Sequence, residues 1–161
     1  MRKSVESCLW IVVPLVLVTA GWAAKDVAVP SACAPSVNEK LAQLISEGQQ
    51  EAVDNVMVCG TTASSSRRQR GGQHGDHQIL PLRVTMPDGG MQLIEVVTND
   101  DLDGKVTAPA NASVFAYGQA FFSHTKQFAA GVHEVHCATH RVADNGWVAV
   151  NGEKHPASCS R

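Results

Sequence analysis

The residues best suited to chemistry lie in one short segment, Gly131 to Trp147, which reads GVHEVHCATHRVADNGW. Imidazole and thiolate groups are the usual ligands of zinc, and imidazole is also the usual acid–base group near neutral pH. The segment therefore suggests metal chemistry, metal-free acid–base catalysis, or polar positions that only hydrogen-bond to backbone carbonyls. The residues concerned are His133, His136, Cys137 and His140.

The alternation of side chains along a strand limits which histidines can share a ligand. Flanking glycine and valine residues favour a strand over residues 131–137. Residues i and i+3 of a strand point to opposite faces, so we expect His133 and His136 to point apart. A divalent metal that activates water then needs ligands from a second segment, around residues 74–77, at one end of the fold. The predicted ligands are His77, His136 and His140, with His74 and Asp76 as alternatives.

The N-terminus has the pattern of a secretory signal peptide. Arg2 and Lys3 precede an apolar run from Leu9 to Ala20, and small residues follow it. The apolar run is too short to cross a bilayer comfortably, although an uncleaved anchor is the alternative. We therefore predict a signal peptide over residues 1–24, a periplasmic or secreted location, and no multi-span membrane protein.

The net charge of the chain limits how it could bind nucleic acid. Loss of Arg2, Lys3 and Glu6 with the leader would leave 11 basic and 14 acidic residues, which is mildly acidic. Such a domain is not built to wrap nucleic acid over its whole surface. A local basic loop could still contact a single-stranded nucleic acid, a glycan or another polyanion, with an aromatic ring as a stacking partner. The predicted ligand-binding residues are Arg67, Arg68, Arg70 and Tyr117.

The cysteines predict two disulfides. Four remain after loss of the leader, and none forms a C-x-x-C pair, so a cysteine-based zinc knuckle is not expected. Three connectivities are possible. We favour Cys33–Cys159, which would clamp both chain ends, and Cys59–Cys137, which would link two strands. A disulfide at Cys137 would remove it as a ligand or nucleophile.

Hydrophobic periodicity predicts one short helix followed by strands. Leu41, Leu44 and Ile45 share one face of a helix over residues 38–48, capped by Ser36 or Asn38 and ended by Gly48. Residues 64–76 and 99–112 are expected to be loops. The predicted strands are Val53–Thr62, Gln78–Met86, Met91–Thr98, Ser113–Phe122 and Gly131–Cys137, with a closing hairpin over Gly146–Glu153.

This order predicts an all-β fold. Five or six strands after one helix fit a small OB-like barrel stapled by disulfides, with a loop in place of the usual helix between the third and fourth strands. A small sandwich is the alternative. We expect an N-terminal segment with the helix over residues 25–52 and the barrel domain over residues 53–161.

The chain also resembles a family of short, exported bacterial proteins of uncharacterised function that carry a His-Trp-Thr-His signature. In this chain Glu134 and Val135 replace the Trp and Thr of the signature, and Cys137 stands where a histidine commonly follows. The resemblance implies no activity, but it groups certain positions as the family pattern. The matching residues are His77-Gln78, Asn99, Asp101-Leu102, Gly118, Gly131-Val132, His133, His136, Gly146-Trp147-Val148 and Gly152.

Two function classes follow from the sequence. No G-x-S-x-G elbow, phosphate-binding glycine loop or H-E-x-x-H helix is present, which favours a binding or interaction module that uses the basic loop. The alternative is a metal-dependent hydrolase, nuclease-like or phosphodiesterase-like, that uses the histidine cluster and possesses a divalent metal cofactor. Whether the protein is an enzyme stays open at this level.

Overall fold

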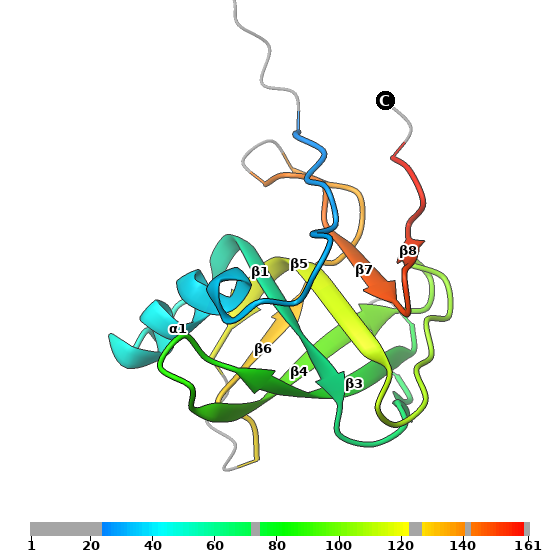
Figure 1. The fold of residues 1–161 in the computed structure, drawn as a ribbon. Helices are drawn as coiled ribbons and strands as arrows, with labels where there is room; N and C mark the ends of the chain where they lie inside the picture. Colours follow the sequence, from blue (N-terminus) through cyan, green and yellow to red (C-terminus); the bar gives the residue numbers. More distant parts are fainter. Residues whose placement is uncertain (1–23, 72–74, 123–126, 141–142, 160–161) are drawn as a thin grey trace, which may run out of the picture.

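A computed structural model describes residues 24–71, 75–122, 127–140 and 143–159. The predicted signal peptide lies outside these residues except for residue 24, and so does His74. The fold is mostly β with one short helix (Figure 1). Within the described residues, no helix has the length and apolar character needed to cross a bilayer.

The elements follow one another closely along the chain. A 3-10 turn, η1 (Pro35–Asn38), leads directly into the helix α1 (Glu39–Ser46). The strands are β1 (Val53–Thr62), β2 (Arg67–Gln69), β3 (His77–Thr85), β4 (Met91–Asn99), β5 (Ser113–Phe121), β6 (Ala130–His133), β7 (Trp147–Val150) and β8 (Glu153–His155).

Five of these strands close into a barrel. They pair in the order β1-β3-β4-β6-β5, and β5 pairs back with β1. All the pairs are antiparallel except β4 with β6, which is parallel. Counted along the chain, the ring order is one, two, three, five, four, which is the topology of an OB barrel. The predicted OB-like fold is therefore confirmed, and a sandwich is excluded.

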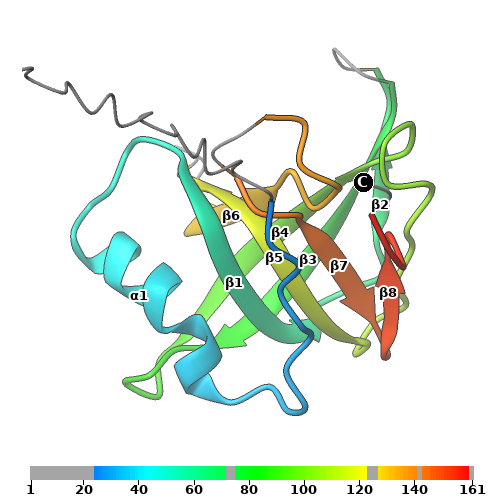
Figure 2. The ribbon, with the colours of Figure 1, turned by 90° about the horizontal axis from the view of Figure 1, so that it is seen from above.

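The remaining elements lie around the barrel. Strand β7 pairs with the first half of β5 and carries β8 on its other side, while β2 pairs with the first residues of β3. Figure 2 shows α1 beside β1 and the β7–β8 hairpin on the other side of the molecule. Strand β2 corrects the sequence prediction, which placed residues 64–76 in a loop; its three residues are all exposed, so no buried periodicity marks it.

The barrel interior is filled by aliphatic side chains. The alternation predicted for β3 is confirmed, because Leu80, Leu82 and Val84 are fully buried. They pack with valine, isoleucine and alanine residues from the other barrel strands and with Leu41 of α1. A second, smaller cluster outside the barrel contains Tyr117, Trp147 and Ala149, with Val27 and Val29 against it.

Asn38 attaches the N-terminal segment to the barrel. Its side chain makes no cap hydrogen bond, contrary to the prediction that it caps the helix. Instead its amide oxygen accepts from Cys59 N at 2.7 Å, and its amide nitrogen donates to Cys59 O and Thr85 O at 3.2 and 3.0 Å. Strands β1 and β3 pair directly at only two positions, Thr61 with Arg83 and Thr62 with Leu82. Asn38 thus supplies hydrogen bonds where the two strands separate.

Both disulfides are present, but the predicted pairing is wrong. Cys33 pairs with Cys59 and Cys137 with Cys159, at Cα–Cα distances of 5.6 and 5.5 Å. The predicted Cys33–Cys159 pair assumed that the two chain ends meet, and the predicted Cys59–Cys137 pair assumed a link between two strands. Because Asn38 docks on the backbone of Cys59, the N-terminal segment runs along β1 and brings Cys33 to that residue.

Candidate functional site

Strand β6 ends at the first histidine of the segment, so the residues that follow do not continue the strand. The last strand residue is His133, and Glu134 has a positive φ of 51°, a left-handed conformation that is uncommon for a residue with a side chain. The chain therefore leaves the strand at Glu134. The prediction that a strand over residues 131–137 points His133 and His136 apart is wrong for this reason.

Two glycines hold the turn after β6 in place. A Cβ on Gly118 would lie 2.2 Å from His133 O, and one on Gly146 would lie 2.2 Å from Glu134 O. Gly146 N also donates to His136 O at 2.8 Å. Only residues without a side chain allow the backbone of the turn to pack this closely against its neighbours. Gly118 and Gly146 thus permit close backbone approach at the turn.

The turn brings three histidines to one cavity. His133 and His136 line a cavity of about 360 Å³ together with His77, the first residue of β3. The cavity lies where β4 and β6 end and β3 begins, and Glu134 also lines it. Its other lining residues are Val97, Asn99, Leu102 and Asp103. His136 and His77, two of the predicted metal ligands, therefore line the same cavity.

Hydrogen bonds fix the tautomer of His77. The side-chain oxygen of Asn99 accepts from Asp101 N at 2.9 Å and from Leu102 N at 3.2 Å, so its amide nitrogen faces the ring. That nitrogen lies 3.2 Å from His77 Nε2 and must donate to it. His77 Nε2 is therefore unprotonated, and the ring proton of the neutral form is on Nδ1.

The other two rings are oriented in the same way. Gln119 donates through Nε2 to Asp54 Oδ1 at 2.7 Å, which turns its carbonyl oxygen toward His133 Nε2 at 2.8 Å. His133 therefore carries its proton on Nε2 and leaves Nδ1 unprotonated when neutral. His136 Nδ1 donates to Cys137 O at 2.9 Å, which leaves Nε2 with its lone pair. Burial lowers the pKa of His133, and the nearby rings of His136 and His77 lower it further. The carboxylates of Glu134 and Asp54 act in the opposite direction and raise this pKa.

Asp103 is a buried carboxyl group in the same cavity. Its Oδ2 accepts from Asn99 N, whereas Oδ1 is buried without a hydrogen-bond partner among the described residues. Burial raises its pKa, although the hydrogen bond from Asn99 and the rings of His136 and His77 act in the opposite direction. Asp103, with its raised pKa, thus shares the cavity with His133, whose pKa is lowered, and such pairs are a frequent mark of acid–base sites. Sequence reasoning missed Asp103, since nothing in its pattern marks it as buried.

The predicted basic loop forms the exposed edge strand β2. All three predicted arginines are exposed, and Gln69 between them pairs with His77, so this edge adjoins the cavity. Arg68 forms an ion pair with Asp76. A hydrogen bond from Gly71 N and this ion pair lower the pKa of Asp76. Arg67 and Arg70 have no ion pair with any described residue.

Tyr117 does not lie with these arginines. It is 7% exposed, its ring stacks on Trp147, and its hydroxyl donates to Asp144 Oδ2 at 2.9 Å. Burial raises the pKa of Tyr117, and the hydrogen bond to Asp144 raises it further. The prediction that Tyr117 offers a stacking surface is therefore wrong. Trp147 is also buried in this cluster, and it does not line the cavity formed by the three other signature positions, His77, His133 and His136.

The predicted metal site of His77, His136 and His140 is not assembled as one set. Among the residues that the structure describes, the three candidate ligand atoms that lie within 4.8 Å of one another belong to Asp54, Glu134 and His140. His140 is grouped with Glu134, which lines the cavity, but His140 is not itself a lining residue. His136 and His77 remain neighbours around the cavity.

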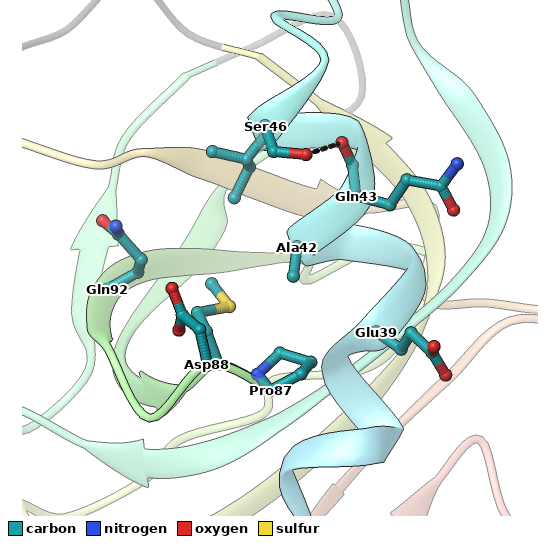
Figure 3. A pocket seen from close by; sticks show the side chains of 9 residues that line it. Glu39, Ala42, Gln43, Ser46, Pro87, Asp88 and Gln92 are labelled. Carbon is teal, nitrogen blue, oxygen red and sulfur yellow. Dashed lines mark hydrogen bonds between the residues drawn. The ribbon is translucent and has the colours of Figure 1, made fainter.

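A second cavity lies between α1 and the β3–β4 hairpin (Figure 3). Its volume is about 580 Å³, and Ala42, Met86 and Pro87 form part of its lining. Ser46 Oγ donates to Gln43 O at 2.8 Å on the helix side. No histidine, cysteine, lysine or arginine lines it. Its titratable lining residues are Glu39 and Asp88, which are both exposed. The histidine cavity instead combines three imidazoles with the buried carboxyl of Asp103, and it is therefore the candidate site.

Comparison with protein-family models, with curated proteins and with solved structures gives no match. The resemblance to the His-Trp-Thr-His family therefore stays a prediction, and the cavity must be interpreted from its own chemistry.

Proposed function

We propose that this protein is an exported hydrolase that cleaves an anionic ester of the phosphodiester class in the histidine cavity. The observation that carries the proposal is the pairing of the buried carboxyl of Asp103 with histidines of fixed tautomer around one cavity. The signal-peptide pattern and two disulfides support export to an oxidising compartment. We also propose that the family resemblance reflects this shared cavity.

In the proposed reaction, two groups move protons. His136 Nε2 accepts a proton from the water that attacks phosphorus, because its other ring nitrogen is committed to Cys137 O. Asp103 donates the proton on Oδ1 to the leaving oxygen as the bond between phosphorus and that oxygen breaks. The hydroxyl of the water remains on phosphorus, and the proton on His136 returns to Asp103 through solvent. The Asn99 amide holds His77 in an orientation suited to positioning the substrate.

Arg67 in β2 and Arg70 directly after it suggest what the proposed binding function would bind. Arg67 and Arg70 lie on the edge beside His77, and a phosphodiester chain that enters the cavity would carry its negative charges past them. Burial raises the pKa of Glu95, and Arg67 lies close enough for its charge to counter that effect. The polyanion expected from the sequence is thus proposed as the substrate rather than a separate partner.

The test compares rates on bis(4-nitrophenyl) phosphate and on a fluorescent single-stranded oligonucleotide, first with EDTA and then with added Mn²⁺. We expect Asp103→Asn and His136→Ala to lower kcat by roughly 10²- to 10⁴-fold, the usual contribution of an acid–base group. The parent rate should fall as pH rises through the raised pKa of Asp103, because the acid must be protonated. The Arg67→Ala/Arg70→Ala variant should raise KM with little change in kcat.

The matched control is His155→Ala, because His155 lies on β8 and does not line the cavity. It should retain the parent rate. A parent protein that hydrolyses neither probe under either condition would overturn the proposal. Equal rates for Asp103→Asn and His155→Ala would do the same.

A further inference from the structure

We propose that Asp54, Glu134 and His140 form a binding site for a divalent transition-metal ion at the edge of the histidine cavity. One ligand atom from each residue lies within 4.8 Å of the other two. Two carboxylates and one imidazole suit Mn²⁺, Fe²⁺ or Zn²⁺, and three protein ligands leave open positions for water or a substrate oxygen. This site differs from the predicted one, because only His140 is common to both.

A β-bulge places Asp54. Val53 pairs with Ala120, and the next paired residue of β1 is Val56, opposite Gly118. Two residues of β1 therefore face one residue of β5, and Asn55 takes a positive φ of 61°. Bulges of this kind turn a side chain out of the strand pattern and are frequent beside active sites.

Glu134 and His140 come from the segment after β6. Glu134 lines the histidine cavity as well as belonging to the trio, so a bound ion would sit next to the cavity. Its backbone is held by Gly118 on one side and Gly146 on the other. His140 lies three residues beyond Cys137, whose disulfide to Cys159 anchors that part of the loop.

One member of the trio, Asp54, also has the outer hydrogen bond expected of a metal ligand. Asp54 Oδ1 accepts from Gln119 Nε2 at 2.7 Å, and Gln119 in turn faces His133 Nε2 at 2.8 Å. Hydrogen bonds to ligating carboxylates orient them for the ion. The same chain of contacts connects the proposed metal ligand Asp54 to a histidine of the cavity.

The charges around the trio favour a cation. Two half-buried carboxylates this close repel each other unless a positive charge lies between them. The nearby ammonium of Lys40 donates instead to the carbonyl oxygens of Asp54 and Asn55, at 2.9 and 3.0 Å. No described lysine or arginine forms an ion pair with either carboxylate. A divalent ion would neutralise the pair.

The test is direct metal binding by the disulfide-bonded protein, stripped with EDTA, dialysed and titrated with Mn²⁺ and then Zn²⁺. Electron paramagnetic resonance reports bound Mn²⁺, and calorimetry gives the stoichiometry and Kd without any substrate. We expect one ion per chain. Glu134→Gln and His140→Ala should each weaken binding at least tenfold, since each removes one of three ligands, while circular dichroism confirms that the variants fold.

The control is the pair Glu153→Gln and His155→Ala. These residues form a carboxylate–histidine pair on β8, with His155 Nε2 at 3.6 Å from Glu153 Oε1. Their loss should leave the Kd unchanged. Absence of stoichiometric binding, or equal binding by the Glu134→Gln and His140→Ala variants and the parent, would overturn the site. Because no substrate is used, this result is separate from the hydrolysis test: a chain that binds Mn²⁺ and cleaves nothing keeps the site and loses the proposed function.

Discussion

At Asp103, the carboxyl group proposed to act in catalysis is also one whose burial makes its ionised form unfavourable for stability. Its Oδ1 has no partner among the described residues, and burial raises its pKa. A raised pKa means that the folded protein holds the carboxyl proton more tightly than the unfolded chain does. The stability associated with this group is therefore complete at a pH below the usual aspartate range and is lost as pH rises through the raised pKa.

Asp103→Asn should consequently make the protein more stable at pH 7 while abolishing the proposed activity. Asparagine keeps an oxygen that can accept from Asn99 N, and it carries no charge that burial would penalise. The urea midpoint of the variant should exceed that of the parent at pH 7, and the two should converge below about pH 3, where aspartate is protonated in both states.

Asp88→Asn is the control, because Asp88 lies exposed in the β3–β4 hairpin. Its midpoint should stay close to that of the parent at both pH values. A parent that is more stable than Asp103→Asn at pH 7 would show that the carboxylate has a stabilising partner.

At the scale of the elements, the sequence predicts what hydrophobic alternation controls. The strands with one buried face were predicted within about two residues, because Leu80, Leu82 and Val84 must all point inward. Strand β2 was missed because its residues are all exposed. The end of β6 was missed because Glu134, a residue with no special turn preference, takes a left-handed conformation that only its tertiary contacts impose.

The candidate site was half predictable for the same reason. Residue type identified His77 and His136 as predicted ligands, and both line one cavity. His133 also lines it, although it was expected to point away from His136, whereas the third predicted ligand, His140, does not line it. Asp54 and Asp103 were missed, because a bulge and a loop position them and neither leaves a pattern in the sequence. Tyr117 was misassigned, since an aromatic residue in a strand can face either solvent or a neighbouring cluster.

Gly118→Ala should test how the elements hold the turn after β6. Its Cβ would meet His133 O, a backbone atom that cannot move without the strand. We expect a loss of roughly 2–4 kcal/mol in the free energy of unfolding, measured by urea denaturation, in the range of other severe packing changes.

Gly90→Ala provides the comparison. A Cβ there would meet only the flexible side chain of Asp88, at 3.0 Å, so the loss should be much smaller. Equal losses for the two variants would argue against the close packing of β5 against the turn.

At the scale of the whole molecule, the barrel depends on the segment that precedes it. Asn38 is 1% exposed and supplies hydrogen bonds to β1 and β3 where their ladder stops. Buried hydrogen bonds therefore attach the N-terminal segment to the barrel. Cys33–Cys59 strengthens the same attachment.

Asn38→Ala should lower the free energy of unfolding by about 3 kcal/mol, because it leaves the buried N–H and C=O of Cys59 and the part-buried C=O of Thr85 without this partner. Thermal and urea denaturation monitored by circular dichroism measure the effect. Gln43→Ala, on the exposed side of α1, should change stability by under about 0.5 kcal/mol. A loss for Asn38→Ala as small as that control would contradict a closing role for the side chain.

The disulfide pattern has a consequence for how the chain matures. Each bridge joins cysteines that are consecutive among the described residues, with sequence separations of 26 and 22. If the chain is exported with its N-terminus first, Cys59 reaches the oxidising compartment when Cys33 is already there as a partner. Cys137 and Cys159 follow later and can then pair with each other. Oxidation in order of appearance therefore produces the native pairs directly. Correct maturation of this chain should need an oxidant but no disulfide isomerase.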